Sequence, residues 1–213
     1  IIYPDGSKDT FVYDNVGNLL KKTTAAGVVT TYTYDLNHNT LSETTGDTTV
    51  SYEYYPNGKL YRQILPDGLT YTYTYDSSWN CILVADSQGN STGYTYDKKG
   101  NQTSVRDALG NKTQYVYDNF GRCTQVVDPN GNKTTYSYDK NDNCIRVTDA
   151  LGHTTQMSYD SLNRLISTTQ YKGGEPVTVS YTYDADGNMT AVTDANGYTT
   201  WYKYAVTGDV TEV

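Results

Sequence analysis

The side chains best suited to catalysis or metal binding are few and widely separated. His38 and His153 lie 115 residues apart, and neither has a paired Cys or a second His near it in the sequence. A metal site built on His needs several ligands at close spacing, and a catalytic nucleophile needs an adjacent base. We therefore predict no catalytic residue, no metal site, no cofactor and no enzymatic activity.

The three cysteines, Cys81, Cys123 and Cys144, occupy equivalent places in a repeating pattern. If each repeat contributes two neighbouring strands, equivalent positions in adjacent repeats lie about 10 Å apart. A disulfide needs Cα atoms within about 7 Å, so we expect Cys123 and Cys144 to be unbridged. Because Leu fills this position in other repeats, we interpret the three thiols as small buried hydrophobic side chains.

Acidic turns offer a calcium hypothesis, most clearly at residues 184–188 and 139–143. A calcium loop needs six or more converging oxygen atoms, usually with a bidentate Glu further on, and only the first half of that pattern is present. Turns closed by an Asp side chain that accepts backbone N–H groups explain the same residues. We favour these Asx turns, with weak calcium binding as the alternative.

Aromatic side chains are the other candidates for binding, since the chain has 24 Tyr against 2 Trp and 2 Phe. Rows of rings can stack on sugars, and Trp79, in a turn, and Trp201, at the start of a strand, are candidate ligand-binding residues. The competing interpretation is that the Tyr columns form the core of a sheet through cross-strand ring pairs. We favour the core, and keep a carbohydrate-binding or adhesive module as the alternative function.

Composition argues against nucleic acid as a partner and against membrane insertion. The net charge of -8 and the isoelectric point near 4.6 argue against nucleic acid. No apolar run approaches the roughly 20 residues that membrane insertion requires. The chain begins and ends partway through a repeat, so we interpret residues 1–213 as a single tandem-repeat region and a fragment of a longer chain.

A Tyr-Asp repeat of about 21 residues organises the whole chain. The Tyr recurs ten times, with gaps of 21 residues except for one gap of 20 and one of 24. Tyr54 and Tyr204 lack the following Asp. The eight complete pairs, which we predict to be structural, are Tyr13 and Asp14, Tyr34 and Asp35, Tyr75 and Asp76, Tyr96 and Asp97, Tyr117 and Asp118, Tyr138 and Asp139, Tyr159 and Asp160, and Tyr183 and Asp184.

Each repeat predicts two short strands and two turns. Nine of the ten Tyr have an aromatic residue two positions earlier, and this spacing places both rings on one face of a strand. Asp and Gly punctuate the turns between strands. The sequence therefore predicts an all-β fold, a long antiparallel meander of hairpins in a curled open sheet that forms a partial shell. The extra residues near 172–176 are expected to form a longer loop.

One spacing leaves two alternatives open. In the second strand of each repeat, apolar residues recur just after the turn and again three positions later, as in Cys123 and Val126. Three is odd, so a regular strand cannot place both on one face. Either a β-bulge follows the turn, or both faces of the sheet are partly covered.

The pattern Tyr-x-Tyr-Asp-x-x-Gly-Asn/Arg-Leu, followed by Thr-Asp-x-x-Gly-Asn, resembles the YD repeats of the RHS family over essentially the whole chain. That family includes bacterial polymorphic toxins, the C component of insecticidal toxin complexes and teneurins. Its repeats form a strip of hairpins that spirals into a hollow shell. Bacterial members cleave themselves at an Asp-Pro-x-Gly-Leu segment, and residues 128–131 are similar to it but sit in phase as an ordinary turn.

The resemblance implies a non-catalytic structural segment of a secreted or cell-surface bacterial protein. The shell that it helps to form would enclose or display a C-terminal toxin or effector domain. The expected partners are the rest of its own chain and that domain. Glycans and edge-to-edge self-association are further candidates, the latter because an open sheet has unpaired edges.

Overall fold

The computed structural model describes residues 1–205 and 207–213, and their secondary structure consists of β-strands and turns. Strands β1 to β19 belong to one antiparallel sheet, and β20 and β21 form a separate two-stranded hairpin. The predicted all-β antiparallel meander is therefore confirmed. None of the described residues form a helix that is long and apolar enough to cross a membrane.

The chain divides into two compact units, residues 1–96 with 105–111, and residues 97–104 with 112–213. In the first unit, consecutive strands pair from β1 to β9. The strands are β1 (Thr10–Tyr13), β2 (Leu19–Thr23), β3 (Val29–Tyr34), β4 (Thr40–Thr45), β5 (Thr48–Tyr54), β6 (Leu60–Ile64), β7 (Thr70–Tyr75), β8 (Cys81–Asp86) and β9 (Ser91–Tyr96).

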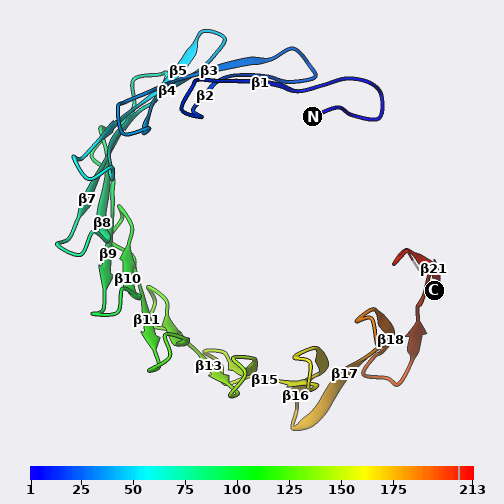
Figure 1. Ribbon diagram of the computed structural model, residues 1–213. Helices are drawn as coiled ribbons and strands as arrows, with labels where there is room; N and C mark the ends of the chain where they lie inside the picture. The colour runs from blue at the N-terminus through cyan, green and yellow to red at the C-terminus, as the bar shows by residue number, and fades with distance from the viewer. Residues whose placement is uncertain (206) are drawn as a thin grey trace. The chain divides into compact units, whose positions relative to one another are not determined.

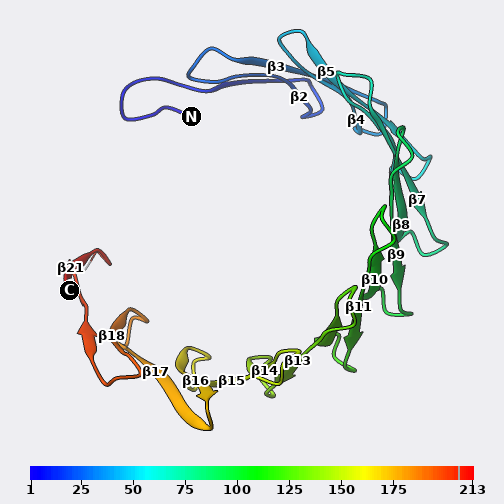
Figure 2. The same ribbon diagram turned by 180° about the vertical axis from the view of Figure 1, so that it is seen from behind.

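Strand β10 (Gln102–Arg106) contributes residues to both units, and the second unit continues the same order with β11 to β19 pairing consecutively. Its strands are β11 (Lys112–Tyr117), β12 (Cys123–Val127), β13 (Lys133–Tyr138), β14 (Cys144–Thr148), β15 (Thr154–Tyr159), β16 (Leu165–Lys172), β17 (Glu175–Tyr183), β18 (Met189–Thr193), β19 (Thr199–Trp201), β20 (Lys203–Tyr204) and β21 (Val210–Glu212). Within each unit the hairpins follow one another in sequence order, and the row bends along its length (Figures 1 and 2).

A β-bulge in each repeat resolves the odd apolar spacing. Tyr117 pairs with Cys123, whereas Tyr115 pairs with Val126, because the register shifts by one residue between Val116 and Tyr117. Thr124 is the extra residue of this bulge. Since paired residues share a face of the sheet, Cys123 and Val126 lie on the same face as the two tyrosines. The same shift recurs in the other repeats, so the bulge alternative is the one present.

The two faces of the sheet differ in chemistry. The tyrosine face carries the Tyr pairs and the apolar residues opposite them, while the polar face is rich in Thr, Ser and Gln. In β13, Tyr136 and Tyr138 are half-buried, and Ser137 between them is exposed. On the polar face, hydroxyl groups bond across strands, as between Thr169 and Thr178 at 2.9 Å.

Few of the described side chains are deeply buried. Among the described residues only Ala191, 2% exposed, and Ser104, 4% exposed, are fully buried. The sequence predicts that the Tyr columns form the core of the sheet, and in the structure rings such as those of Tyr136 and Tyr138 are half-buried within the sheet. Cross-strand contacts within the layer therefore hold the fold together.

The expected long loop near residues 172–176 is wrong. The extra residues lengthen strands β16 and β17, which pair out to Lys172 and Glu175. Gly173 and Gly174 form a two-residue turn in which both have positive φ, 61° and 90°. Two adjacent glycines adopt this conformation without a Cβ clash, and it matches the twist of the strands.

Candidate functional site

The repeated Tyr links each repeat to the one before it. The hydroxyl of Tyr138 donates to the backbone carbonyl of Cys123 at 2.8 Å, and Cys123 is a residue of the preceding bulge. Burial raises the pKa of Tyr138, which keeps this donor protonated. Equivalent bonds are made by Tyr34, Tyr54, Tyr75, Tyr96, Tyr117, Tyr159, Tyr183 and Tyr204.

The repeated Asp closes the turn that follows it. In residues 139–143, Asp139 Oδ1 accepts the backbone N–H groups of Asn141 and Asn143, and Asp139 Oδ2 accepts the Asn143 side-chain amide. All eight Asp of the Tyr-Asp pairs accept from the backbone N–H four residues later. The Asn143 side-chain amide lowers the pKa of Asp139, so the carboxylate is ionised at neutral pH. The geometry is that of the predicted Asx turns.

The turns at the other edge use the same bonds. Asp128 accepts the backbone N–H groups of Asn130 and Asn132 and the side-chain amide of Asn132. The turn that is similar to a cleavage segment is thus built like its neighbours. His153 takes the Asn place in the next turn of this row and bonds Asp149 through Nδ1 at 2.9 Å.

Two arginines that the sequence analysis left without a role join adjacent repeats. Arg122 takes the Asn place in its turn and bonds Asp118 Oδ2 at 2.7 Å. Its guanidinium also donates to the carbonyl of Asp139 and to Asp142 Oδ1, both at 2.8 Å, and lies over the Tyr138 ring. Arg164 likewise bonds Asp160 Oδ2 in its own turn, donates to the carbonyl of Asp184 in the turn at 184–188 at 2.8 Å, and lies over the Tyr183 ring. The repeat pattern in the sequence allows Arg in the Asn place of the turn. Only the structure shows that this Arg side chain contacts the next repeat.

Trp79 packs in an aromatic cluster instead of standing alone. Its ring centroid lies 5.9 Å from that of Tyr55 and 6.0 Å from that of Tyr75, and Tyr55 also contacts Tyr61 at 5.2 Å. Tyr55 replaces the usual Asp, and Trp79 replaces the usual Gly with a φ of 61°. The two residues that depart from the repeat pattern, Tyr55 and Trp79, therefore contact each other. Trp79 remains 44% exposed.

Trp201 lies at the end of β19, where the sequence analysis expected a strand start, and is 65% exposed. It pairs with Ala191 in the neighbouring strand. The carbohydrate-binding hypothesis for these two residues stays a prediction.

The described residues hold no recognisable reaction centre. No group of three or more His, Cys, Asp or Glu side chains among them is arranged to hold a metal ion. Cys81, Cys123 and Cys144 are free thiols and half-buried. His38, which takes a Gly place in its turn, has the expected positive φ of 66° and contacts Asn18 Oδ1 through Nδ1 at 3.0 Å.

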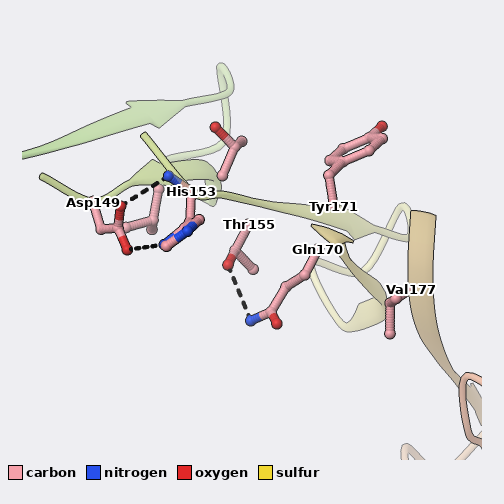
Figure 3. A pocket seen from close by; sticks show the side chains of 8 residues that line it. Asp149, His153, Thr155, Gln170, Tyr171 and Val177 are labelled. Atoms are coloured by element: carbon pink, nitrogen blue, oxygen red, sulfur yellow. Dashed lines mark hydrogen bonds and ion pairs between the residues drawn. The ribbon is translucent and has the colours of Figure 1, made fainter. Parts of the chain in front are cut away.

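The best-defined hollow lies beside the lengthened hairpin. It is a cleft of about 370 Å³ between the turn at 149–153 and strands β16 and β17. The lining residues are Val147, Asp149, His153, Thr154, Thr155, Gln170, Tyr171 and Val177 (Figure 3). The sequence analysis missed it, because its only signal was the 24-residue gap in the repeat.

These repeats match a known family. The model of the RHS repeat matches residues 13–50, 80–112, 96–133, 117–144, 138–176 and 177–204, which is more than half of the chain. The chain belongs to the RHS repeat family. Its repeats are structural, as the resemblance in the sequence implied.

Solved structures share the fold. A Photorhabdus luminescens Tc holotoxin pore with a TccC3 mutation is 16% identical, with a TM-score of 0.59 over 95% of this chain and 14% of that chain. A complex of TcdB2-TccC3 with Cdc42 is 14% identical, with a TM-score of 0.51 over 96% of this chain and 17% of that chain. At these identities the likeness concerns the fold alone. This chain spans about a sixth of those chains. A comparison with curated protein sequences finds no match.

Proposed function

We propose that this RHS chain is a wall segment of a secreted or cell-surface bacterial shell that encloses a C-terminal toxin or effector domain. The partners in this proposal are the rest of its own chain and the enclosed domain. The segment contributes a continuous barrier and performs no chemical step.

The observation that carries the proposal is the unbroken linkage between repeats. Nine Tyr hydroxyls in succession bond the preceding repeat, so the sheet has no repeat that lacks a link to its predecessor. Such a sheet closes off one side from the other, because each strand from β1 to β19 pairs with the next. The shared fold with Tc toxin structures supports the same role.

Limited proteolysis of the complete protein tests the enclosure. The C-terminal domain attached to intact repeats should be digested at least about tenfold more slowly than the same domain produced alone, because a protease reaches it only after the wall opens. Mass spectrometry of the fragments follows both rates.

Two controls separate enclosure from simple stabilisation. Repeats weakened by Tyr138→Phe together with Arg122→Asn should speed the digestion of the attached domain and leave the isolated domain unchanged. Equal digestion rates for attached and isolated domains would mean that the domain is displayed outside, and enclosure would be wrong. A complete protein with no domain beyond its repeats would also overturn the proposal.

A further inference from the structure

The cleft beside the lengthened hairpin has a different surface from the rest of the sheet. It exists because β16 and β17 extend beyond the length of the other hairpins, so their ends stand beside the turn at 149–153 (Figure 3). The side chains of Gln170 and Val177 line one side, and those of Asp149 and His153 line the other.

Asp149 fixes the chemistry of the His153 ring. Its Oδ1 atom accepts the backbone N–H groups of Leu151 and His153, and its Oδ2 atom accepts from His153 Nδ1. A carboxylate at Nδ1 holds the proton of a neutral imidazole on that nitrogen and leaves Nε2 as an acceptor. Three of the roughly four acceptor positions of the carboxylate are already used.

Gln170 presents a second acceptor in the cleft. Its Nε2 atom donates to Thr155 Oγ1 at 3.3 Å, which turns the amide so that its oxygen has no partner within the described residues. When the imidazole is neutral, the cleft therefore offers two acceptors, the His153 Nε2 atom and the Gln170 oxygen. Val147 and Val177 lie at opposite ends of the cleft lining, with strands β15 and β16 between them, and Val177 is the cross-strand partner of Gln170.

These features define the ligand that the cleft can take. It must donate hydrogen bonds to two acceptors and place C–H groups against Val177, which lies beside Gln170. An anion is disfavoured by Asp149 and by the net charge of -8. A volume of about 370 Å³ is near the lower limit of small-molecule sites, which matches one or two sugar rings.

We propose that the cleft formed by His153, Gln170, Val147 and Val177 binds a neutral sugar of one or two rings. Sugar hydroxyls donate to Nε2 and to the amide oxygen, and the C–H face of a ring packs against Val177 beside Gln170. This site is separate from the shell function and does not use Trp79 or Trp201.

Isothermal titration calorimetry on the complete protein tests the site with N-acetylglucosamine, its β-1,4-linked dimer, maltose and lactose, each at millimolar concentration. We expect saturable binding of at least one of them. His153→Asn should weaken it about tenfold by removing one acceptor, and Gln170→Leu should weaken it similarly. His153→Asn preserves the turn because Asn132 makes the same bonds in the neighbouring turn.

A matched control uses the exposed aromatic residue outside the cleft. Trp201→Ala should leave the affinity unchanged, and sialyllactose should bind more weakly than lactose because it carries a negative charge. Four results would each overturn the proposal: no saturable binding of any neutral sugar, binding that survives both cleft substitutions, binding lost in Trp201→Ala, or tighter binding of sialyllactose. None of them bears on whether the repeats enclose a domain.

Discussion

The two edges of the sheet in the second unit share turns closed by Asp, apart from the Gly173-Gly174 turn, but differ in the connections between turns. The Tyr-Asp edge comprises turns 97–101, 118–122, 139–143, 160–164 and 184–188, and the opposite edge comprises turns 128–132, 149–153, 172–175 and 194–198. Both use Asp to close the turn, as in Asp139 and Asp128. The contrast lies in the bonds that run from one turn to the next.

At the Tyr-Asp edge, side chains connect successive turns. Lys99 donates to the carbonyl of Asn119 at 2.7 Å, and Arg122 bonds the turn at 139–143. Asn143 donates to Asn163 Oδ1 at 2.9 Å, and Arg164 bonds the turn at 184–188. Four connections in a row therefore hold this edge at a set spacing.

At the opposite edge, the described residues show no hydrogen bond from one turn to the next. The clefts between turns 128–132 and 149–153, and between turn 149–153 and the lengthened hairpin, lie here. Bonds from the charged side chains of Lys99, Arg122 and Arg164 restrain the Tyr-Asp edge, so we expect local opening and ligand access to be easier at the opposite edge.

Lowering the pH should produce the largest change in the free energy of unfolding, and it should affect the turns at both edges. The side-chain amides of Asn143 and Asn132 lower the pKa values of Asp139 and Asp128. Because the folded pKa lies below the unfolded value of about 3.9, this stability is present above that pH and is lost as pH falls through the folded pKa. Unfolding by urea at pH 7 and at pH 3 should show a clear loss at pH 3. Equal midpoints would contradict a shared Asp-based turn.

Arg122→Asn should raise hydrogen exchange at the Tyr-Asp edge and leave it unchanged at the opposite edge. Asn keeps the bond to Asp118 but loses the guanidinium bond to the Asp139 carbonyl and the contact with the Tyr138 ring, so the connection between turns 118–122 and 139–143 is reduced to at most one bond of the kind that Asn143 makes to Asn163. Hydrogen exchange of amides at 139–143 should rise by about tenfold. Amides at 128–132 in the same sample serve as the control, and a similar rise there would show that the edges are not independently restrained.

Tyr138→Phe should have a smaller effect, since it removes one hydrogen bond and leaves the carbonyl of Cys123 without this donor. We expect the free energy of unfolding to fall by about 1 kcal/mol. Tyr136→Phe is the matched control, because within the described residues no hydrogen bond uses the Tyr136 hydroxyl, and it should change stability by less than about 0.5 kcal/mol. Equal losses in urea titrations would argue that the rings, and not the hydroxyl bonds, link the repeats.

His153→Asn should have the smallest effect on stability. The turn at 149–153 would become like the turn at 128–132, in which Asn132 bonds Asp128. The change in the free energy of unfolding should stay within about 0.5 kcal/mol in a urea titration. A larger loss would mean that His153 connects this turn to the lengthened hairpin.

The sequence was sufficient for features that recur with the repeat. The i, i+2 spacing of the rings predicted strands, and Asp with Gly predicted the turns, because both depend on a few consecutive residues. The odd spacing of Cys123 and Val126 pointed to a bulge but left a second alternative, since register is a property of two strands. The structure decides it through the pairing of Tyr117 with Cys123.

Features that depend on departures from the repeat were harder to predict. The Arg122 connection, the packing of Trp79 on Tyr55 and the cleft at Gln170 each need contacts between residues at least 15 positions apart. The Gly173-Gly174 pair was read as part of a loop, although adjacent glycines between strand residues are a known signal for a tight hairpin. That error hid the cleft, which exists because the strands are long.

The Tyr hydroxyl bond tolerates changes in chain length. Tyr138 reaches back 15 residues to Cys123, whereas Tyr183 reaches back 18 residues to Leu165 and still makes a 2.8 Å bond. The three extra residues extend a hairpin sideways and leave the strand order unchanged. Residues inserted at a hairpin end therefore add new surface and leave the Tyr hydroxyl bonds between repeats intact. Evolution or protein design can thus change the surface of one hairpin at a time.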